Sequence, residues 1–150
     1  MIPYVVEKIM KITKITKTYL KDLSYKVIGA AIEVHKELGP GLLERVYQKC
    51  LEHELTLRGI NYISEIPVHV NYKGVSVNTD LRCDYFVENI LPVELKSTDG
   101  FIPINEAQTL TYMKLLNAPK GLLLNFNVSN IFQEGQRTFV NELYRNLPDE

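Results

Sequence analysis

The segments LRCDYFV (residues 81–87) and LPVELK (residues 91–96) decide the fold of this chain. Their β-branched and aromatic content and the short gap between them predict two antiparallel strands. If the reversal is centred on Asn89, Asp84 and Glu94 face each other about 4.5–5.5 Å apart at Cβ, because both are equally distant from Asn89. Lys96 follows Glu94 by two positions and therefore projects from the same face. The sequence predicts two carboxylates and one amine on one small patch.

Two carboxylates this close repel each other by about 1 kcal/mol in water and about 4 kcal/mol at an effective dielectric constant of 20. A divalent cation offsets this repulsion, and Mg²⁺ is usually held by one or two carboxylates. Such an ion acidifies water and stabilises charge at a phosphorus centre, and Lys96 could orient or deprotonate that water or offset phosphate charge. The alternative is a solvated sheet face on which Lys96 neutralises Glu94, since an E-x-K triplet arises by chance about once in such a chain.

Length and composition describe one ordinary globular domain. The 150 residues are 45% hydrophobic and 23% charged, and no apolar run approaches the length of a membrane helix. No secretory pattern opens the chain, so we expect a cytoplasmic protein that is not in the membrane. A net charge of −1 argues against a protein that coats nucleic acid but allows an enzyme that touches it briefly. Two isolated cysteines and three scattered histidines indicate neither a disulfide framework nor a zinc site.

Basic residues are candidates for a nucleic-acid path or for ordinary surface charge. Lys73 lies in an expected turn, Arg82 lies beside the acidic pair, and Lys114 lies on an expected helix. Residues 1–21 carry lysines every three or four positions among isoleucines and valines. This N-terminal basic extension could be an amphipathic helix that touches nucleic acid or a membrane, or a segment upstream of a later start at Met10. The remaining residues, 22–150, form the expected domain.

Periodicity predicts a mixed α/β protein, an α+β sandwich. Two helices come first: one is capped by Asp22 or Ser24 and ends at Gly39-Pro40-Gly41, and the other spans 42–57. We read the Gly39-Pro40-Gly41 turn as a helix corner, because it lacks the G-K-[ST] ending of a phosphate-binding loop. The elements expected after the helices are a three-stranded antiparallel meander (62–72, 75–87 and 91–96), a helix (104–116), a strand buried on both faces (121–126), and a last segment (132–147) with a short strand or turn and a closing helix.

Further polar residues could be directed at the acidic cluster by helices packed on the sheet. Glu44, Tyr47 and Gln48 share a side of the second helix, and Gln108 and Tyr112 share a side of the helix after the meander. Alternatives remain for two of them. Glu44 suits the first turn of a helix through the helix dipole, and Tyr112 suits a core aromatic whose hydroxyl reaches the rim.

Taken in order along the chain, these motifs resemble the PD-(D/E)xK nuclease superfamily, which has a restriction-endonuclease-like core. The matching signature is Asp84 on the second strand and Glu94-Leu95-Lys96 on the third. Gly41, Glu44 and Tyr47 resemble the motif of the G-x-x-E-x-x-Y group, and Gln108 with Tyr112 resembles the Q-x3-Y element of RecB-like exonucleases. The resemblance covers roughly residues 22–147.

The resemblance implies a metal-dependent phosphodiesterase site. Asp84 and Glu94 would be ligands of Mg²⁺ or Mn²⁺, with the Leu95 carbonyl as a further ligand. Lys96 would position or activate the water, and Glu44 would hold a water molecule or a second ion. Gln108 and Tyr112 would orient Lys96 or the phosphate backbone. Pro92 is a departure, because a bulge there would shift the strand pairing by one residue and turn Asp84 away from Glu94.

The leading hypothesis is a small nuclease that uses Mg²⁺ or Mn²⁺ to cleave DNA phosphodiester bonds, with DNA as its partner and a second copy of the chain as a further candidate partner. The rival is a catalytically silent interaction module on the same fold that acts with a partner protein. The near-neutral charge and the lack of an appended DNA-binding domain favour this rival. Glycoside hydrolysis by a carboxylate pair is disfavoured by the adjacent lysine and by the absence of tryptophan.

Overall fold

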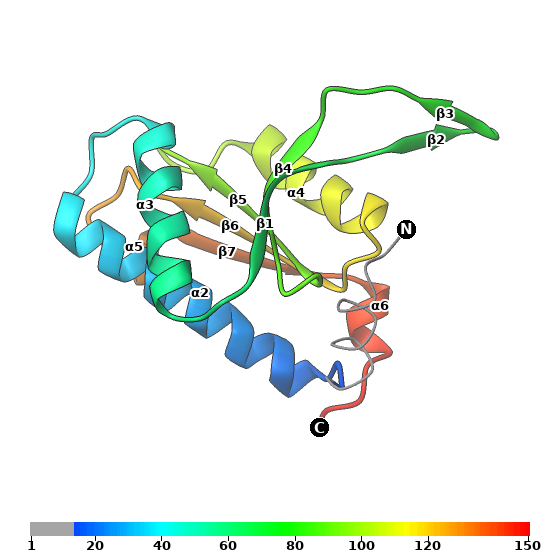
Figure 1. The fold of residues 1–150 in the computed structure, drawn as a ribbon, viewed down its shortest axis with the longest axis horizontal. Coiled ribbons are helices and arrows are strands. Elements are labelled where there is room, and N and C mark those ends of the chain that lie inside the picture. The colour runs from blue at the N-terminus through cyan, green and yellow to red at the C-terminus, as the bar shows by residue number, and fades with distance from the viewer. Residues whose placement is uncertain (1–13) are drawn as a thin grey trace.

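The computed structural model describes residues 14–150, and its elements are labelled as in Figure 1. The helices are α2 (Lys17–Leu38), α3 (Glu44–Leu57), α4 (Pro103–Leu115), α5 (Ile131–Glu134) and α6 (Glu142–Arg145). The strands are β1 (Tyr62–Pro67), β2 (Val70–Tyr72), β3 (Val75–Val77), β4 (Arg82–Val87), β5 (Leu91–Lys96), β6 (Lys120–Asn125) and β7 (Gln136–Val140). Within residues 14–150, no helix is long and apolar enough to cross a membrane.

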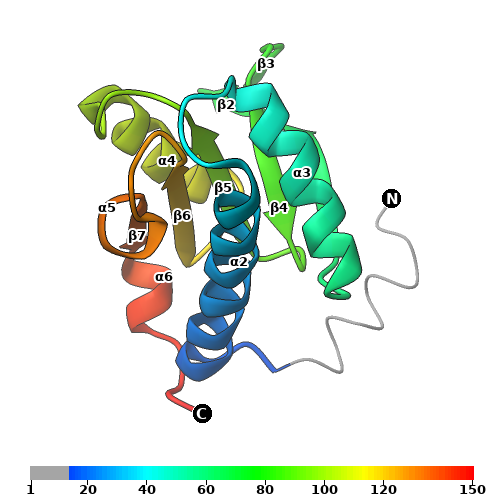
Figure 2. The ribbon, with the colours of Figure 1, turned by 90° about the vertical axis from the view of Figure 1, so that its left-hand side faces the viewer.

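A five-stranded mixed sheet in the order β1-β4-β5-β6-β7 forms the centre of the fold. β5 and β6 are parallel and are connected through α4, whereas the other neighbouring strands are antiparallel. Helices α2 and α3 cover one face of the sheet and α4 covers the other (Figures 1 and 2). The expected mixed α/β sandwich is therefore confirmed, with β7 as an added edge strand.

The main hydrophobic core lies between the sheet and the pair α2 and α3. Every residue of β6 is buried, as predicted for a strand covered on both faces. Leu122 and Leu124 join the main core, and Phe126 extends it beyond the end of the strand. The other main members come from α2, α3, β4 and β5: Leu23, Val27, Ala31, Val34, Tyr47, Leu51, Leu55, Tyr85, Val87, Leu91, Val93 and Leu95.

The first helix begins earlier than the sequence predicted. Its N-cap is Thr16, whose side chain accepts a hydrogen bond from the backbone N–H of Tyr19 at 3.0 Å. The prediction of Asp22 or Ser24 as N-cap was wrong, because Leu20 is also buried and extends the apolar face towards the N-terminus. Ser24 instead lies inside the helix and donates to the Leu20 carbonyl. Most of the expected basic amphipathic helix falls in residues 1–13, outside the described residues.

The two long strands expected at 62–72 and 75–87 are each interrupted. β1 ends at Pro67 and pairs with β4, while β2 and β3 form a separate two-stranded sheet that projects from the body (Figure 1). Beyond Pro67, Val68 still donates its N–H to the Leu81 carbonyl and is buried with Cys83 and Tyr112, and the chain then enters the projecting hairpin. The three-stranded antiparallel arrangement is kept as β1-β4-β5.

The last segment was predicted only in outline. It contains β7, which pairs antiparallel with β6, and two single-turn helices, α5 and α6, where one closing helix was expected. Asn130 and Asn141 cap these helices by accepting from Gln133 N and Tyr144 N. Each cap starts a new turn, so the polar asparagines divide the segment.

Close packing of α4 on β6 depends on Gly121. A Cβ atom at this position would lie 2.7 Å from Met113 Sδ and 2.8 Å from Met113 Cγ, both within the buried layer. We expect Gly121→Ala to lower the free energy of unfolding by about 1–3 kcal/mol in chemical denaturation. Gly29→Ala is the matched control, because its Cβ would meet only the flexible Arg58 side chain at 3.4 Å. It should leave stability unchanged or raise it by up to about 1 kcal/mol.

Candidate functional site

Asp84 and Glu94 lie together at a point where the ladder between β4 and β5 opens. The paired residues are Tyr85 with Val93, Phe86 with Pro92 and Val87 with Leu91, which centres the reversal on Asn89 as predicted. Pro92 is accommodated within this register without a shift. The backbone pairing does not continue to positions 84 and 94.

Side chains replace the backbone hydrogen bonds beyond this point. The N–H of Asp84 donates to Glu94 Oε1 at 2.8 Å, and the N–H of Leu95 donates to Asp84 Oδ2 at 2.8 Å. Each carboxylate thus satisfies a backbone donor near the other, which buried N–H groups require. The reciprocal hydrogen bonds hold the two acidic groups in fixed positions.

The ladder between β1 and β4 is interrupted at the same level. Pairing is present on both sides of Glu65 and Asp84 but not between them, and Glu65 has a left-handed φ of 52°. Tyr85 packs in the main core, whereas Cys83, two residues away, packs with Tyr112 on the α4 side. The regular alternation of faces therefore breaks at Asp84, whose backbone is paired with neither neighbouring strand.

The acidic pair carries an electrostatic cost. Glu94 is 3% exposed, and burial raises its pKa to about 8, with the charge of Asp84 as the next cause. Burial also raises the pKa of Asp84 to about 6, and the charges of Glu44 and Glu65 add to this effect. Lys96 Nζ lies 4.0 Å from Glu94 Oε2, at the limit of an ion pair, and does not offset the loss of solvation. The pair thus favours a bound proton or a cation.

The turn before α3 is fixed by hydrogen bonds and places Glu44 near Asp84. The hydroxyl of the fully buried Tyr47 donates to the Gly39 carbonyl and accepts from Leu42 N, while its ring stacks on Phe126 with centroids 4.5 Å apart. The Ser97 hydroxyl donates to the Leu42 carbonyl at 2.7 Å, which joins the residue after Lys96 to this turn. Tyr47 therefore points into the core and positions the start of α3.

Glu44 and Glu65 line one pocket beside Asp84. The pocket has a volume of about 400 Å³, and Arg45, Gln48 and Lys49 complete its wall. Glu65 was missed by sequence reasoning, because Ser64-Glu65-Ile66 has the pattern of an ordinary strand. Its position between the pairs Ser64–Tyr85 and Ile66–Cys83 sets it opposite Asp84, and its left-handed backbone is not predicted by the local residue types.

The two candidate site residues of α4, Tyr112 and Gln108, differ in how they relate to the acidic pair. Tyr112 is buried, and its pKa is raised to about 12 by burial and then by the charges of Glu94, Cys83 and Asp84, so it neighbours the pair. Its packing against Val68 and Cys83 matches the alternative of a core aromatic. Gln108 is half-buried on the same helix, and within residues 14–150 no hydrogen bond joins it to Asp84, Glu94 or Lys96.

The basic candidates are spread over three places. Arg82 is exposed at the first residue of β4, Lys73 lies in the turn between β2 and β3, and Lys114 is exposed on the last turn of α4. Lys73 Nζ lies 5.3 Å from the centroid of the Tyr72 ring. These three residues do not converge on Asp84 and Glu94 as an ion-paired cluster.

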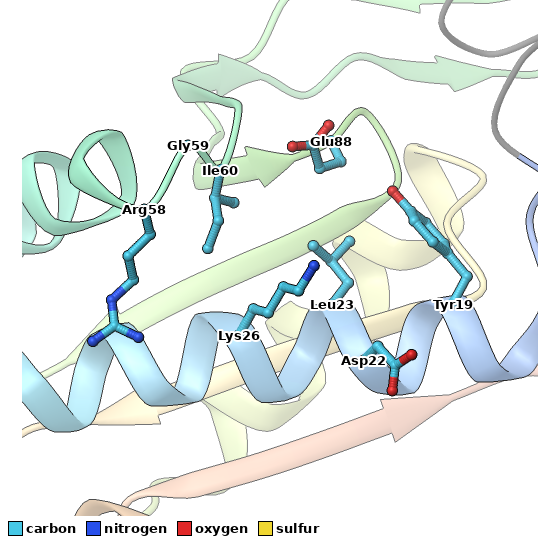
Figure 3. A pocket seen from close by; sticks show the side chains of 8 residues that line it. All are labelled: Tyr19, Asp22, Leu23, Lys26, Arg58, Gly59, Ile60 and Glu88. Atoms are coloured by element: carbon cyan, nitrogen blue, oxygen red, sulfur yellow. The ribbon is translucent and has the colours of Figure 1, made fainter.

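A larger pocket lies away from the acidic pair. It has a volume of about 500 Å³ and is enclosed by α2, the end of α3 and Glu88 (Figure 3). Glu88 is already engaged there, because its carboxylate accepts a hydrogen bond from Asn61 N at 2.8 Å. The wall of this pocket contains the cations Lys26 and Arg58 and the carboxylates Asp22 and Glu88. None of the candidate site residues lines it.

The acidic pair suits a hard divalent cation. In residues 14–150 no group of three or more His, Cys, Asp or Glu side chains is close enough to hold a metal ion. Asp84 and Glu94 each use one oxygen, Oδ2 and Oε1, for a backbone N–H, and the second oxygen of Glu94 lies 4.0 Å from Lys96 Nζ. Two oxygen donors of a buried, mutually repelling pair fit Mg²⁺ or Mn²⁺, which need only one or two carboxylates.

The raised pKa values predict an unusual pH dependence of stability in chelator. Protonation of Asp84 and Glu94 favours the folded state, because their folded pKa values of about 6 and about 8 exceed the ordinary values. The stabilisation from this protonation is complete at pH values below the ordinary pKa of each group. It is lost as the pH rises through the pKa of that group in the folded protein. Thermal melts should therefore show wild type losing stability, relative to Glu94→Gln, between about pH 5 and pH 9.

Added Mg²⁺ or Mn²⁺ should raise the melting temperature more at high pH than at low pH, since protons and cation compete for the same oxygens. Equal pH profiles for wild type and Glu94→Gln would contradict the assignment of this dependence to the acidic pair.

Comparison with known proteins agrees with this geometry. Residues 21–138 match the sequence profile of the PD-(D/E)XK nuclease superfamily. No curated protein matches the chain. No solved structure matches it either. The matched region contains the acidic pair, Lys96 and the mixed sheet up to the middle of β7, and the architecture is that of the restriction-endonuclease-like fold. The chain therefore belongs to the PD-(D/E)XK nuclease superfamily.

Proposed function

We propose that this protein is a divalent-metal-dependent nuclease that hydrolyses DNA phosphodiester bonds. The observation that carries the proposal is the reciprocal hydrogen bonding of Asp84 and Glu94, which engages one oxygen of each carboxylate and leaves Glu94 Oε2 4.0 Å from Lys96 Nζ. Membership of the nuclease superfamily supports it. Gly41, Glu44 and Tyr47 further suggest the G-x-x-E-x-x-Y group within that superfamily.

Asp84 and Glu94 would hold Mg²⁺ or Mn²⁺ through Oδ1 and Oε2, with the Leu95 carbonyl as a further ligand. When bound, the ion supplies positive charge that lowers the pKa of water and stabilises charge developing at phosphorus. Glu44, whose charge already acts on Asp84, would hold a water molecule or a second ion. The low exposure of Glu94 strengthens these interactions, because little water competes for its oxygens.

Lys96 would orient the attacking water and offset the negative charge of the phosphate. In hydrolysis the water oxygen bonds to phosphorus and the bond from phosphorus to the leaving oxygen breaks. The attacking water loses a proton to solvent, and the leaving oxygen takes up a proton from solvent to become a hydroxyl. The Lys96 side chain is 21% exposed, so it can reach a substrate while remaining near Glu94 Oε2. Gln108 and Tyr112 would orient Lys96 or the phosphate backbone, and Arg82, Lys73 and Lys114 would contact flanking phosphates.

Removing the acidic pair should abolish metal-dependent cleavage. Purified wild type should degrade single- or double-stranded DNA with Mg²⁺ or Mn²⁺, whereas Glu94→Ala and Asp84→Asn should lose at least about 100-fold of the rate. Calorimetry should show Mn²⁺ binding to wild type and its loss in Asp84→Asn.

Glu142→Gln is the matched control for this experiment, because Glu142 is an exposed acid on α6 whose ion pair, among residues 14–150, is with Arg145. It should leave both cleavage and Mn²⁺ binding unchanged. Equal cleavage by wild type and Glu94→Ala would mean a contaminating nuclease. Absence of both cleavage and Mn²⁺ binding in wild type would favour a catalytically silent module that acts with a partner protein.

Lys96 should matter for chemistry more than for metal binding. We expect Lys96→Ala to lower the cleavage rate by about 100-fold or more while Mn²⁺ binding in calorimetry is retained. Lys96→Arg should recover part of the phosphate contact but little of the water-orienting role, because the guanidinium is larger and remains charged. Lys36→Ala is the control for loss of an exposed lysine, because Lys36 lies in the last turn of α2 and is not a candidate site residue. A Lys96→Ala enzyme with the wild-type rate would remove Lys96 from the mechanism.

A further inference from the structure

The β2–β3 arm (residues 70–77) is a hairpin that extends away from the main sheet in Figure 1. Within the described part of the chain, residues 14–150, its two strands pair with each other and with no other strand. Asn71 Oδ1 accepts from Gly74 N at 3.0 Å, and Lys73 and Gly74 have the positive φ values of a tight hairpin turn. The turn is therefore well formed, although an isolated two-stranded hairpin is only marginally stable in water.

The base of the arm is attached to the candidate site. Val68 is 1% exposed and packs with Cys83 and Tyr112, and Cys83 is adjacent to Asp84 in β4. Two hydrogen bonds close the base: Val68 N donates to the Leu81 carbonyl and Thr79 Oγ1 donates to the Val68 carbonyl, both at 2.9 Å. The arm thus continues directly from the strands that flank Asp84.

The surface of the arm is aromatic and cationic without carboxylates. Tyr72 and Val75 are each 62% exposed, and Lys73 Nζ lies near the Tyr72 ring. No Asp or Glu occurs between Glu65 and Asp80. Single-stranded nucleic acids are bound by this combination, since bases stack on aromatic rings and the backbone is drawn to positive charge.

A protein partner fits the arm less well. Stable protein interfaces use about 20–30 residues on each side, which is several times the number of residues in this hairpin. One aromatic ring is sufficient for one base, so the arm is large enough for a nucleic-acid contact.

We propose that the arm, through Tyr72 and Lys73, holds an unpaired base of the strand whose phosphodiester lies at Asp84 and Glu94. The inference rests on the proposed function and adds a substrate class, single-stranded or locally unpaired nucleic acid. Val75, at the far end of the arm, is nine residues from Asp84. At about 3.3 Å per residue this spans at most about 30 Å, or roughly nine stacked nucleotides.

A tryptophan reporter tests the contact, because the chain contains no tryptophan. Tyr72→Trp in the full chain, with chelator present to prevent cleavage, should show quenched fluorescence when a single-stranded oligonucleotide of about 20 nucleotides is added, since this length exceeds the span. A blunt duplex of equal length should quench it less. Tyr25→Trp is the matched control, because Tyr25 is 53% exposed on α2, and its fluorescence should not respond.

Affinity provides a second readout. By fluorescence anisotropy of the same oligonucleotide, Tyr72→Ala should weaken binding about 10-fold or more, whereas Tyr72→Phe should retain it, because the ring and not the hydroxyl stacks. Thermal melts of both variants should match wild type, since Tyr72 is exposed.

Three results would overturn the inference. They are equal quenching by duplex and single strand, unchanged affinity in Tyr72→Ala, and a concentration-dependent change in Tyr72→Trp emission without nucleic acid, which would indicate that a second copy covers the arm. If wild type cleaves DNA but the Tyr72→Trp fluorescence does not respond to nucleic acid, the contact by the arm is refuted and the nuclease proposal stands. If the Tyr72→Trp fluorescence responds but the protein cleaves no nucleic acid with Mn²⁺, the contact by the arm is supported and the proposed nuclease function is refuted.

Discussion

The reciprocal hydrogen bonds between Asp84 and Glu94 are the constraint on which the candidate site depends. They occur where β4 leaves regular pairing with both β1 and β5, so two backbone N–H groups need new acceptors. The carboxylates supply those acceptors and are held in place as a result. A regular ladder would satisfy the same donors with carbonyls and leave both side chains without this restraint. The opening of the sheet and the ordering of the acidic pair are thus one structural event.

Burial gives this arrangement its chemical character. A pair on an open sheet face would be solvated and would ionise normally, whereas Glu94 is nearly inaccessible and both groups resist ionisation. Lys96 is close enough to influence the pair but too far to neutralise it fully. The folded chain therefore carries a local electrostatic strain that a proton or a divalent cation relieves. This property distinguishes the pair from the many charged residues on the surface.

The site also depends on contacts between distant parts of the chain. Tyr47 fixes the turn after α2 from inside the core, and Ser97 ties that turn to the end of β5. Glu44 consequently begins its helix within electrostatic reach of Asp84. The sequence predicted Glu44, Tyr47 and Gln48 on one side of α3, and in the structure Tyr47 lies wholly within the core. Its contribution to the site is positional, through the turn that precedes Glu44.

The sequence by itself determined the strand register around Asn89, the buried character of β6 and the mixed α/β class, because periodicity and short-range pairing are local properties. Only the tertiary structure decided where the long strands break, that Thr16 caps α2, and that Glu65 joins Glu44 beside Asp84. Val68, next to the break, is buried with Tyr112 of α4, a contact between residues more than forty positions apart. The raised pKa values likewise depend on exclusion of water by several elements at once, which no local pattern encodes.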